Sequence, residues 1–320
     1  MSTLTQRLDD YLAVRRSLGY DLSSSARVLR GFAAFADRQD TDHITVDLFL
    51  RWKAAFGKAN NDTWSARLGM VRVFARWLQG HDPRTEVPPA GLIAGKLRRG
   101  RPYIYSDSEI AAIVTRAEGL KSRYDLRGWT CSTVFGLIAV TGLRINEALR
   151  LDDDDIDFDA GVITVMRSKN GRVRFVPIAA STVGQLRIYR AERIRLLGTT
   201  GSAFFRNDDG RRLRDGAARY NFAIVSQGIG LRAVQRFYKN GCGPRIHDLR
   251  HTFAVRTMIG WYRKGLDPDR EMIKLSSYLG HTTPDDTYWY IEAVPELLRL
   301  AVERAERMPA KNARKKGGER

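Results

Sequence analysis

The stretch VITVMRSKNGRVRFV, residues 162–176, contains a clear change in the period of the sequence. Residues 162–166 and 173–176 have the period of two that is expected of β-strands. Asn170-Gly171 lies between them and favours a type I′ turn, whose two central residues need positive φ angles. The stretch therefore predicts a β-hairpin with Lys169 at its tip.

Helical patterns lie on both sides of this hairpin. Upstream, residues 106–109 (SDSE) form a capping box, a buried helix runs from about 128 to 140, and another short helix follows Gly142. Downstream, apolar residues return to helical spacing. The expected fold is therefore mainly α with a small antiparallel β-hairpin or sheet, an α+β domain over residues 106–308 followed by a basic disordered tail at 309–320.

The chain carries 54 Lys and Arg against 36 Asp and Glu, a net charge of +18. Such an excess needs a polyanionic partner, and nucleic acid is the first candidate. The basic residues are spread through both halves, which argues against a membrane-surface helix. No apolar run of ~18 residues and no secretory signal pattern is present. We expect a cytoplasmic, nucleoid-associated protein whose Cys131 and Cys242 stay reduced.

The first 95 residues show helical periodicity alone and suffice for a four-helix bundle. A basic linker follows at 96–105. Pro and Gly residues just before it interrupt any helix there. The candidate DNA-binding residues are Arg72, Arg76, Lys96, Arg98, Arg99 and Arg101. For Arg72 and Arg76, which lie in the bundle, the alternative is a solvated position on a helix surface.

Five sequence features of the second domain suit phosphate chemistry. They are, in order, TGLRINEALRL (141–151), the hairpin lysine, HDLRHTF (247–253), YLGH (278–281) and a tyrosine at 290. In HDLR, the i, i+3 spacing places an imidazole and a guanidinium on one helical face, a pair suited to a phosphate oxygen. Each feature alone is weak, whereas their order and local spacing together are specific.

Taken in order, these features resemble the tyrosine recombinase (phage integrase) family of site-specific DNA recombinases. That family has an Arg in TGxRxxE, a Lys on a hairpin tip, an HxxR pair, a His or Trp after LG, and a Tyr nine residues later. The resemblance covers residues 102–308, and the N-terminal lobe resembles the core-binding domain more loosely. It implies as catalytic residues Arg144, Lys169, His247, Arg250, His281 and Tyr290.

The resemblance implies that Tyr290 attacks a phosphodiester and forms a 3′-phosphotyrosine. A phenol with a pKa of ~10 is rarely ionised at neutral pH, which costs ~4 kcal/mol before attack. Arg144 and Arg250 would neutralise the non-bridging oxygens and stabilise the charge that develops on phosphorus. The phosphotyrosine conserves bond energy, so no ATP, metal or other cofactor is expected.

The remaining roles follow from the same resemblance. His281 would donate to the phosphate oxygens, and His247 would accept or position the phenolic proton. Lys169 would protonate the leaving 5′-oxygen, and Glu147 would orient the site. The implied partner is double-stranded DNA with specific recombination sites, bound by a homotetramer in the synaptic complex and by a monomer or dimer otherwise. Integration of a mobile element is the favoured role, and any accessory recombination proteins stay unidentified.

Several alternatives stay open at this point. A type IB topoisomerase or a telomere resolvase would share most catalytic residues, and a non-catalytic DNA-binding regulator would share the charge. The acidic run 152–159 could hold Mg²⁺, although a solvated turn is favoured. Zinc on Cys242, His247 and His251 lacks a convincing fourth ligand. Tyr288 is the alternative nucleophile, and His251 is expected to be structural or DNA-proximal.

Overall fold

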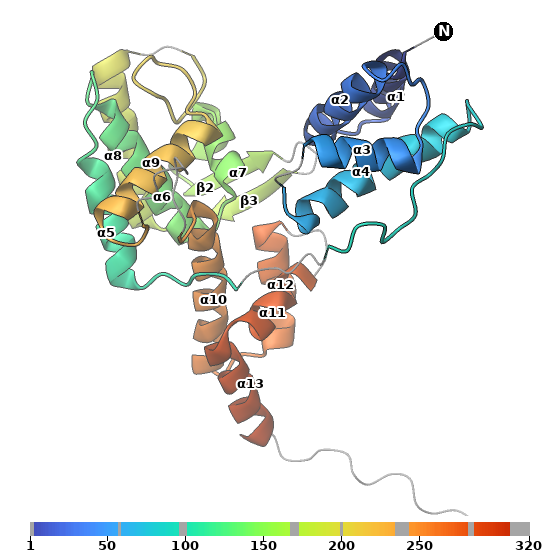
Figure 1. Ribbon diagram of the computed structural model, residues 1–320. Helices are drawn as coiled ribbons and strands as arrows, with labels where there is room; N and C mark the ends of the chain where they lie inside the picture. The colour runs from blue at the N-terminus through green and yellow to red at the C-terminus, as the bar shows by residue number, and fades with distance from the viewer. Residues whose placement is uncertain are drawn as a thin grey trace, which may run out of the picture. The chain divides into compact units, whose positions relative to one another are not determined.

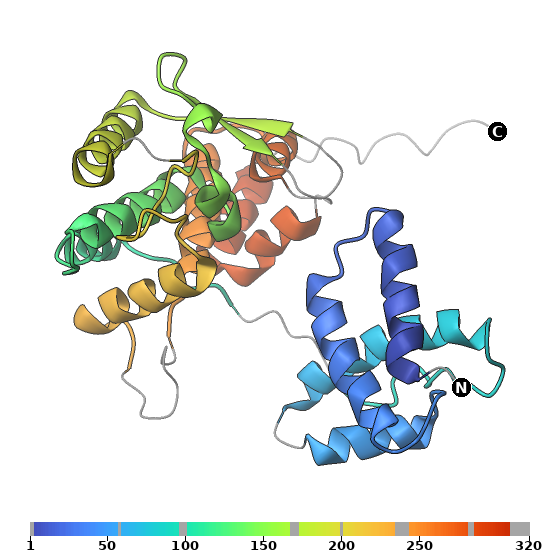
Figure 2. The same cartoon turned by 90° about the horizontal axis from the view of Figure 1, so that it is seen from above.

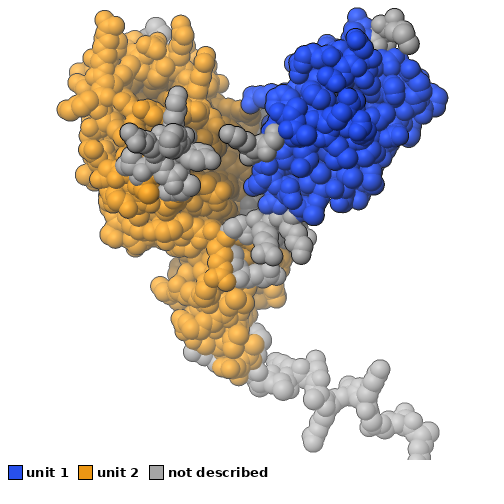
Figure 3. All heavy atoms as spheres, in the orientation of Figure 1, with its two compact units in different colours: residues 1–100 blue, residues 101–320 orange. Residues whose placement is uncertain are grey.

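The computed structural model describes residues 3–56, 59–95, 101–166, 173–198, 201–233, 243–280 and 285–307. The chain divides into two compact units, residues 1–100 and residues 101–320 (Figure 3). Among the described residues, no helix combines the length and the apolar character needed to cross a membrane.

Unit 1 is a helical bundle, which confirms the predicted helical N-terminal region. Its helices are α1 (Leu4–Ser17), α2 (Ser23–Asp37), α3 (Val46–Ala55) and α4 (Asn61–Gln79) (Figure 1). Side chains cap three of them, because Thr3, Thr45 and Asn60 accept hydrogen bonds from first-turn amides. Aromatic rings from α2, α3 and α4 pack edge to face at the centre of the bundle.

Unit 2 begins with helices and a small sheet that packs against them. The helices are α5 (Asp107–Glu118), α6 (Leu126–Thr141), α7 (Ile145–Arg150), α8 (Ala180–Leu197) and α9 (Asp215–Gly228), with a 3-10 turn, η1, at Asp153–Asp155. The predicted capping box at Ser106 and Glu109 is present at the start of α5. Apolar residues of α6 are buried almost all round, which makes it the central helix of this part of the core.

The sheet has three antiparallel strands in the order β1 (Ile156–Asp157), β2 (Val162–Met166) and β3 (Val173–Pro177). The two predicted hairpin strands are confirmed, and they pair antiparallel with Met166 opposite Val173. The tip, residues 167–172 with Lys169, lies outside the described residues. Strand β3 passes beside α11 (Pro268–Leu279), which brings the hairpin next to the C-terminal helices (Figure 2).

The C-terminal part of unit 2 gathers around α10 (Ile246–Arg263) (Figure 1). Besides α11, it contains α12 (Asp285–Ala293) and α13 (Pro295–Arg307), and these helices share a third apolar cluster. Leu297 of α13 is fully buried in this cluster, whereas Leu298 and Val302 are exposed. Helix α13 therefore packs on its own unit through one face and leaves a second apolar face uncovered. The expected tail at 309–320 lies outside the described residues.

Residues 101–105, which the sequence placed in the linker, belong to unit 2. Tyr105 is buried; its amide donates to Thr252 Oγ1 (2.9 Å) and its hydroxyl donates to the Arg245 carbonyl (3.0 Å). The end of the linker is therefore attached to the first turns of α10. Residues 96–100 lie outside the described part of the chain.

Gly142, which ends α6, has φ +64° and admits no side chain. A Cβ there would lie 2.5 Å from Phe253 Cδ1 and 3.0 Å from Leu279 Cδ2. We predict that Gly142→Ala lowers the free energy of unfolding by about 1–3 kcal/mol, because crowding adds to left-handed backbone strain. Urea denaturation would measure the change.

Gly184 offers the matched control, because it lies inside α8 with no atom within 4 Å of an added Cβ. Gly184→Ala should raise the free energy of unfolding by up to about 1 kcal/mol, since alanine favours the helix. Equal effects of the two substitutions would contradict the assigned role of Gly142.

Candidate active site

Two arginine side chains from separate helices meet at one backbone carbonyl. Arg144, the N-cap of α7, donates from Nη1 to the Leu279 carbonyl (3.3 Å) and from Nη2 to the Gly280 carbonyl (3.2 Å). Arg250 of α10 donates from Nη2 to the same Leu279 carbonyl (2.9 Å) and from Nη1 to the Gly142 carbonyl (2.6 Å). The fold thus brings together the two arginines that the sequence motifs indicated.

Glu147 connects this pair to the sheet. Its carboxylate accepts from Arg144 Nη1 (3.0 Å) and from the Arg144 amide (2.9 Å). It also accepts two bonds from Arg174 of β3, at 3.0 and 2.7 Å, and Arg174 Nε donates to the Tyr278 carbonyl (2.9 Å). Burial opposes ionisation of Glu147, but Arg174 and Arg144 outweigh it and lower the pKa to about 2.

The cluster carries more positive than negative charge. Arg144, Arg174 and Arg250 supply three cations, and Glu147 supplies one carboxylate to balance them. Arg250 is 1% exposed, and its described hydrogen bonds go to neutral carbonyls. Burial and the charge of Arg144 lower the pKa of Arg250 to about 10, so it stays protonated at neutral pH. An anion such as a phosphodiester would relieve this excess.

His247 lies one turn before Arg250 on α10 and is half-buried. Burial lowers the pKa of its imidazole to about 4, and the nearby Arg250 and Arg245 add to this effect. At neutral pH the ring is therefore uncharged, with one nitrogen able to donate a hydrogen bond and one able to accept.

Tyr290 reaches the same place from α12. Its hydroxyl is hydrogen-bonded at 2.8 Å to Nδ1 of His251, the residue that follows Arg250 on α10. Tyr290 is 2% exposed, whereas Tyr288, the alternative nucleophile, is 41% exposed. The tyrosine selected by motif spacing therefore lies against α10, the helix that carries Arg250.

Other predicted site residues have varied positions. Arg72 is partly buried and donates from Nε to the Pro88 carbonyl (2.6 Å), so its guanidinium is hydrogen-bonded within unit 1. Arg76 and Arg101 are exposed, as phosphate ligands would be. The remaining candidates fall outside the described residues: Lys96, Arg98, Arg99, Lys169 and His281.

The acidic run 152–159 was predicted to be a solvated turn. In the structure, part of it forms ion pairs with arginines as well as a turn. Asp153 binds the buried Arg193 (2.8 Å), and Asp152 pairs with Arg212. Asp155 accepts from the Asp152 amide (2.8 Å) in η1. Across the described segments, no three His, Cys, Asp or Glu side chains are grouped as metal ligands. Cys131 is a free, buried thiol, and Cys242 lies outside these segments.

Sequence reasoning did not assign Arg174 to the site or His251 to Tyr290. A signal for Arg174 existed: in the alternation of β3 it shares a face with the buried Val176, while Phe175 points outward and is 66% exposed. A buried arginine needs a carboxylate, and that requirement could have indicated Glu147. No comparable signal links His251 to Tyr290, because the contact joins two helices far apart in sequence.

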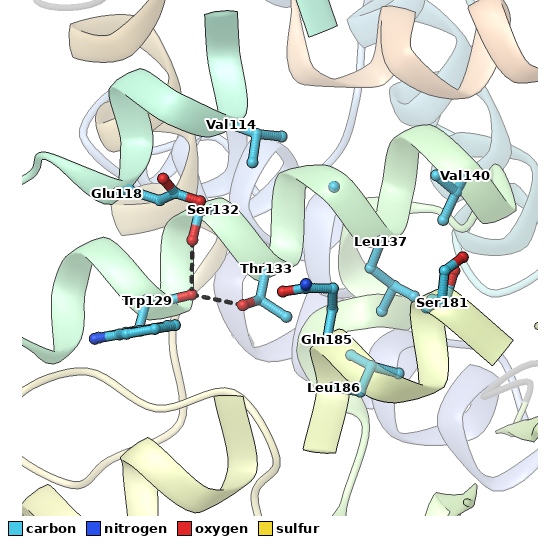
Figure 4. Close-up of a pocket in the computed structure, with 12 residues that line it drawn as sticks. Val114, Glu118, Trp129, Ser132, Thr133, Leu137, Val140, Ser181, Gln185 and Leu186 are labelled. Carbon is cyan, nitrogen blue, oxygen red and sulfur yellow. Dashed lines mark hydrogen bonds between the residues drawn. The ribbon is translucent and has the colours of Figure 1, made fainter. Parts of the chain in front are cut away.

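A separate cavity of about 360 Å³ lies between α5, α6 and α8 (Figure 4). Its wall includes Trp129, whose carbonyl accepts hydrogen bonds from the Ser132 and Thr133 hydroxyls. None of the arginines, histidines or tyrosines described above lines it. The arginine cluster is therefore a distinct site.

Comparison with known proteins identifies the family of the chain. The model of the Phage integrase family matches residues 107–296. An integrase/recombinase of Sinorhizobium fredii designated y4rB is 41% identical over 312 residues, 96% of this chain and 98% of the relative. Tyrosine recombinase XerC of Chromobacterium violaceum is 30% identical over 226 residues, 70% of this chain and 67% of the relative. The fold resembles that of a lambda integrase tetramer bound to a Holliday junction (TM-score 0.60, 20% identity, 89% and 79% covered).

Glu147 gives the site a testable pH dependence. We predict that Glu147→Gln lowers the free energy of unfolding by about 3–5 kcal/mol at neutral pH, as expected when a buried ion pair loses one partner. The folded-state pKa is depressed, so the wild-type stabilisation is present above the ordinary value of 4.5 and is lost as pH falls toward about 2. Denaturation at a series of pH values would measure both effects.

Glu192→Gln is the matched control, because Glu192 pairs with the exposed Arg195 on the surface of α8. Its effect should stay below about 1 kcal/mol. A difference between Glu147→Gln and wild type that persists unchanged at acidic pH would contradict the ionised state of Glu147.

Proposed function

Because the chain belongs to the phage integrase family of site-specific tyrosine recombinases, which break and rejoin DNA, we propose that it cuts DNA through a covalent 3′-phosphotyrosine at Tyr290. One observation carries this proposal: Arg144 and Arg250 meet at the Leu279 carbonyl, and Tyr290 is hydrogen-bonded to His251, the residue that follows Arg250. The excess positive charge there suits a single phosphodiester, and the tyrosine supplies the nucleophile.

The proposed chemistry assigns the electrostatic work to the arginines. Arg144 and Arg250 would bind the non-bridging oxygens and stabilise the charge that builds up in the five-coordinate transition state. Each has donors in a planar guanidinium, which matches the geometry of two phosphate oxygens. Glu147 and Arg174 would hold Arg144 in its orientation before DNA binds. The neutral His247 would hydrogen-bond within the same site.

Two further roles rest on the sequence motifs. Lys169 at the hairpin tip would protonate the leaving 5′-oxygen, and His281 would donate to a phosphate oxygen. Strand β3 supports the proposed delivery of Lys169, because Arg174, five residues beyond it, is bonded to Glu147 of the site. The cationic side chains would replace a metal ion, so the reaction needs neither metal nor ATP.

The proposed nucleophile can be tested by trapping. Wild-type protein incubated with a nicked suicide substrate in excess EDTA should form a covalent DNA adduct, and peptide mapping should place it on Tyr290. Tyr290→Phe should form none, because it lacks the attacking oxygen. Tyr288→Phe is the matched control and should retain the adduct, since Tyr288 lies on the same helix but is exposed.

Three results would contradict the proposal. An adduct on Tyr288, or undiminished adduct from Tyr290→Phe, would overturn the assignment of the nucleophile. Cleavage that is lost in EDTA and restored by Mg²⁺ would return the acidic run 152–159 to consideration as a metal nuclease site.

The proposed assembly is a homotetramer on two specific DNA sites, with a monomer or dimer off DNA. The uncovered face of α13 supports it, because Leu298 and Val302 lie one turn apart and are 45% and 55% exposed. The resemblance to a tetrameric lambda integrase supports the same assembly. Integration of a mobile element is the role we favour, by likeness to the integrase/recombinase of Sinorhizobium fredii.

We predict that the double substitution Leu298→Glu with Val302→Glu lowers tetramer formation on DNA by at least about tenfold, because a buried unpaired charge costs more than ~1.4 kcal/mol. Binding of one site should be unaffected, because Leu297, which anchors α13 on its own unit, is kept. Light scattering of the protein–DNA complex would measure the assembly. Ile188→Glu, on an exposed face of α8, is the control. Normal assembly of the double variant would remove this face of α13 from the interface.

A further inference from the structure

The hydroxyl of Tyr290 has a defined partner in this structure. Its Oη lies 2.8 Å from His251 Nδ1, and the two rings meet edge to face with centroids 5.4 Å apart. The His251 side chain is 12% exposed and Tyr290 is 2% exposed. The hydrogen bond joins α10 to α12 in a protected environment, where such a bond is strong.

The opposite side of the imidazole faces a carboxylate. His251 Nε2 lies 4.0 Å from Asp248 Oδ1, a distance of electrostatic contact. Asp248 is 3% exposed and accepts from the Arg245 amide (2.7 Å) and from Arg245 Nη2 (3.2 Å), which fixes its position. A carboxylate on the Nε2 side favours the tautomer with its proton on Nε2. In that tautomer Nδ1 carries the lone pair that accepts the hydrogen bond of Tyr290 Oη.

Neighbouring rings hold the imidazole in place. The His247 ring lies 4.6 Å from it, almost perpendicular, and the Trp289 ring lies 5.7 Å from it. His251 follows Arg250 on α10, so the helix places an imidazole beside the tyrosine and a guanidinium beside the proposed phosphate. Burial and the positive charges of Arg250 and Arg245 lower the pKa of the His247 imidazole to about 4, which makes His247 a weak base.

We propose that His251 is a catalytic residue that accepts the proton of Tyr290 during DNA cleavage; this rests on the proposed function. As the Oη–phosphorus bond forms, the phenolic proton passes to Nδ1 of His251. The bond from phosphorus to the 5′-oxygen breaks, and the leaving oxygen takes its proton from the general acid. Asp248 stabilises the imidazolium, as a carboxylate does beside a histidine base. On rejoining, the proton returns from Nδ1 to Oη.

The test measures the rate of adduct formation in a single turnover, with the full-length protein and a nicked suicide substrate, from acidic to alkaline pH. The rate of adduct formation by wild type should fall at acidic pH, where His251 is protonated. At higher pH the rate should reach a plateau. Asp248, His247 and Arg250 of α10 and Tyr290 of α12 set where this change occurs. His251→Gln should be slower by ~10²–10⁴-fold at neutral pH.

The pH profile separates proton transfer from packing. Without an internal base, the rate of His251→Gln should rise about tenfold per pH unit toward the ordinary phenol pKa of ~10. DNA affinity should be unchanged, because His251 contacts the nucleophile. His251→Ala should regain rate on addition of imidazole, which a purely structural defect would not allow. His81→Gln, the same substitution on an exposed histidine of unit 1, should behave as wild type.

Each contrary result has a definite meaning. A wild-type adduct on Tyr290 together with an unaffected His251→Gln rate would overturn the role of His251 alone. A faster rate in His251→Gln would also overturn it, because the hydrogen bond would then restrain Tyr290. A slow variant with the wild-type pH profile and no rescue of His251→Ala by imidazole would reduce His251 to packing. Absence of any wild-type adduct on Tyr290 would instead overturn the proposed function.

Discussion

The candidate site depends on the C-terminal end of α11. The last carbonyls of a helix have no partner within it, and the helix dipole makes this end negative. Here the carbonyls of Tyr278, Leu279 and Gly280 accept hydrogen bonds from guanidinium groups that belong to α7, β3 and α10. One short stretch of backbone therefore holds three arginines that would otherwise repel one another, and it fixes the relative positions of three elements.

The arrangement concentrates positive charge around the Leu279 carbonyl. Glu147 offsets part of that charge, and its hydrogen bonds to Arg144 and Arg174 leave Arg250 with neutral carbonyl partners. A rigid, preorganised set of donors loses little free energy to reorganisation when the reacting charge develops. The proposed proton acceptor His251 and the proposed nucleophile Tyr290 meet next to this cluster, so charge stabilisation and proton transfer can occur together.

Local patterns that depend on neighbouring residues were predictable. The capping box at Ser106, the strands on either side of Asn170-Gly171 and the helices of unit 1 follow from propensity and period, and the structure has them. The roles of particular charges were less predictable. The acidic run was expected to be solvated, yet Asp153 binds a buried arginine, because Arg193 comes from α8, 40 residues further along the chain. Residues 101–105 were expected to be linker, yet they belong to unit 2 for a similar reason. Tyr105 is hydrogen-bonded to Thr252 of α10 and to Arg245 at the start of that helix, both far along the chain.

By itself the sequence determined the fold class, the family motifs and the candidates Arg144, Arg250 and Tyr290, because these depend on residue type and short spacing. The tertiary structure alone decided which groups share a hydrogen bond. Arg174 joins Glu147 through the pairing of β3, and His251 joins Tyr290 through the packing of α10 against α12. Such contacts depend on the relative positions of distant elements to within an ångström, and no local pattern of residues encodes that distance.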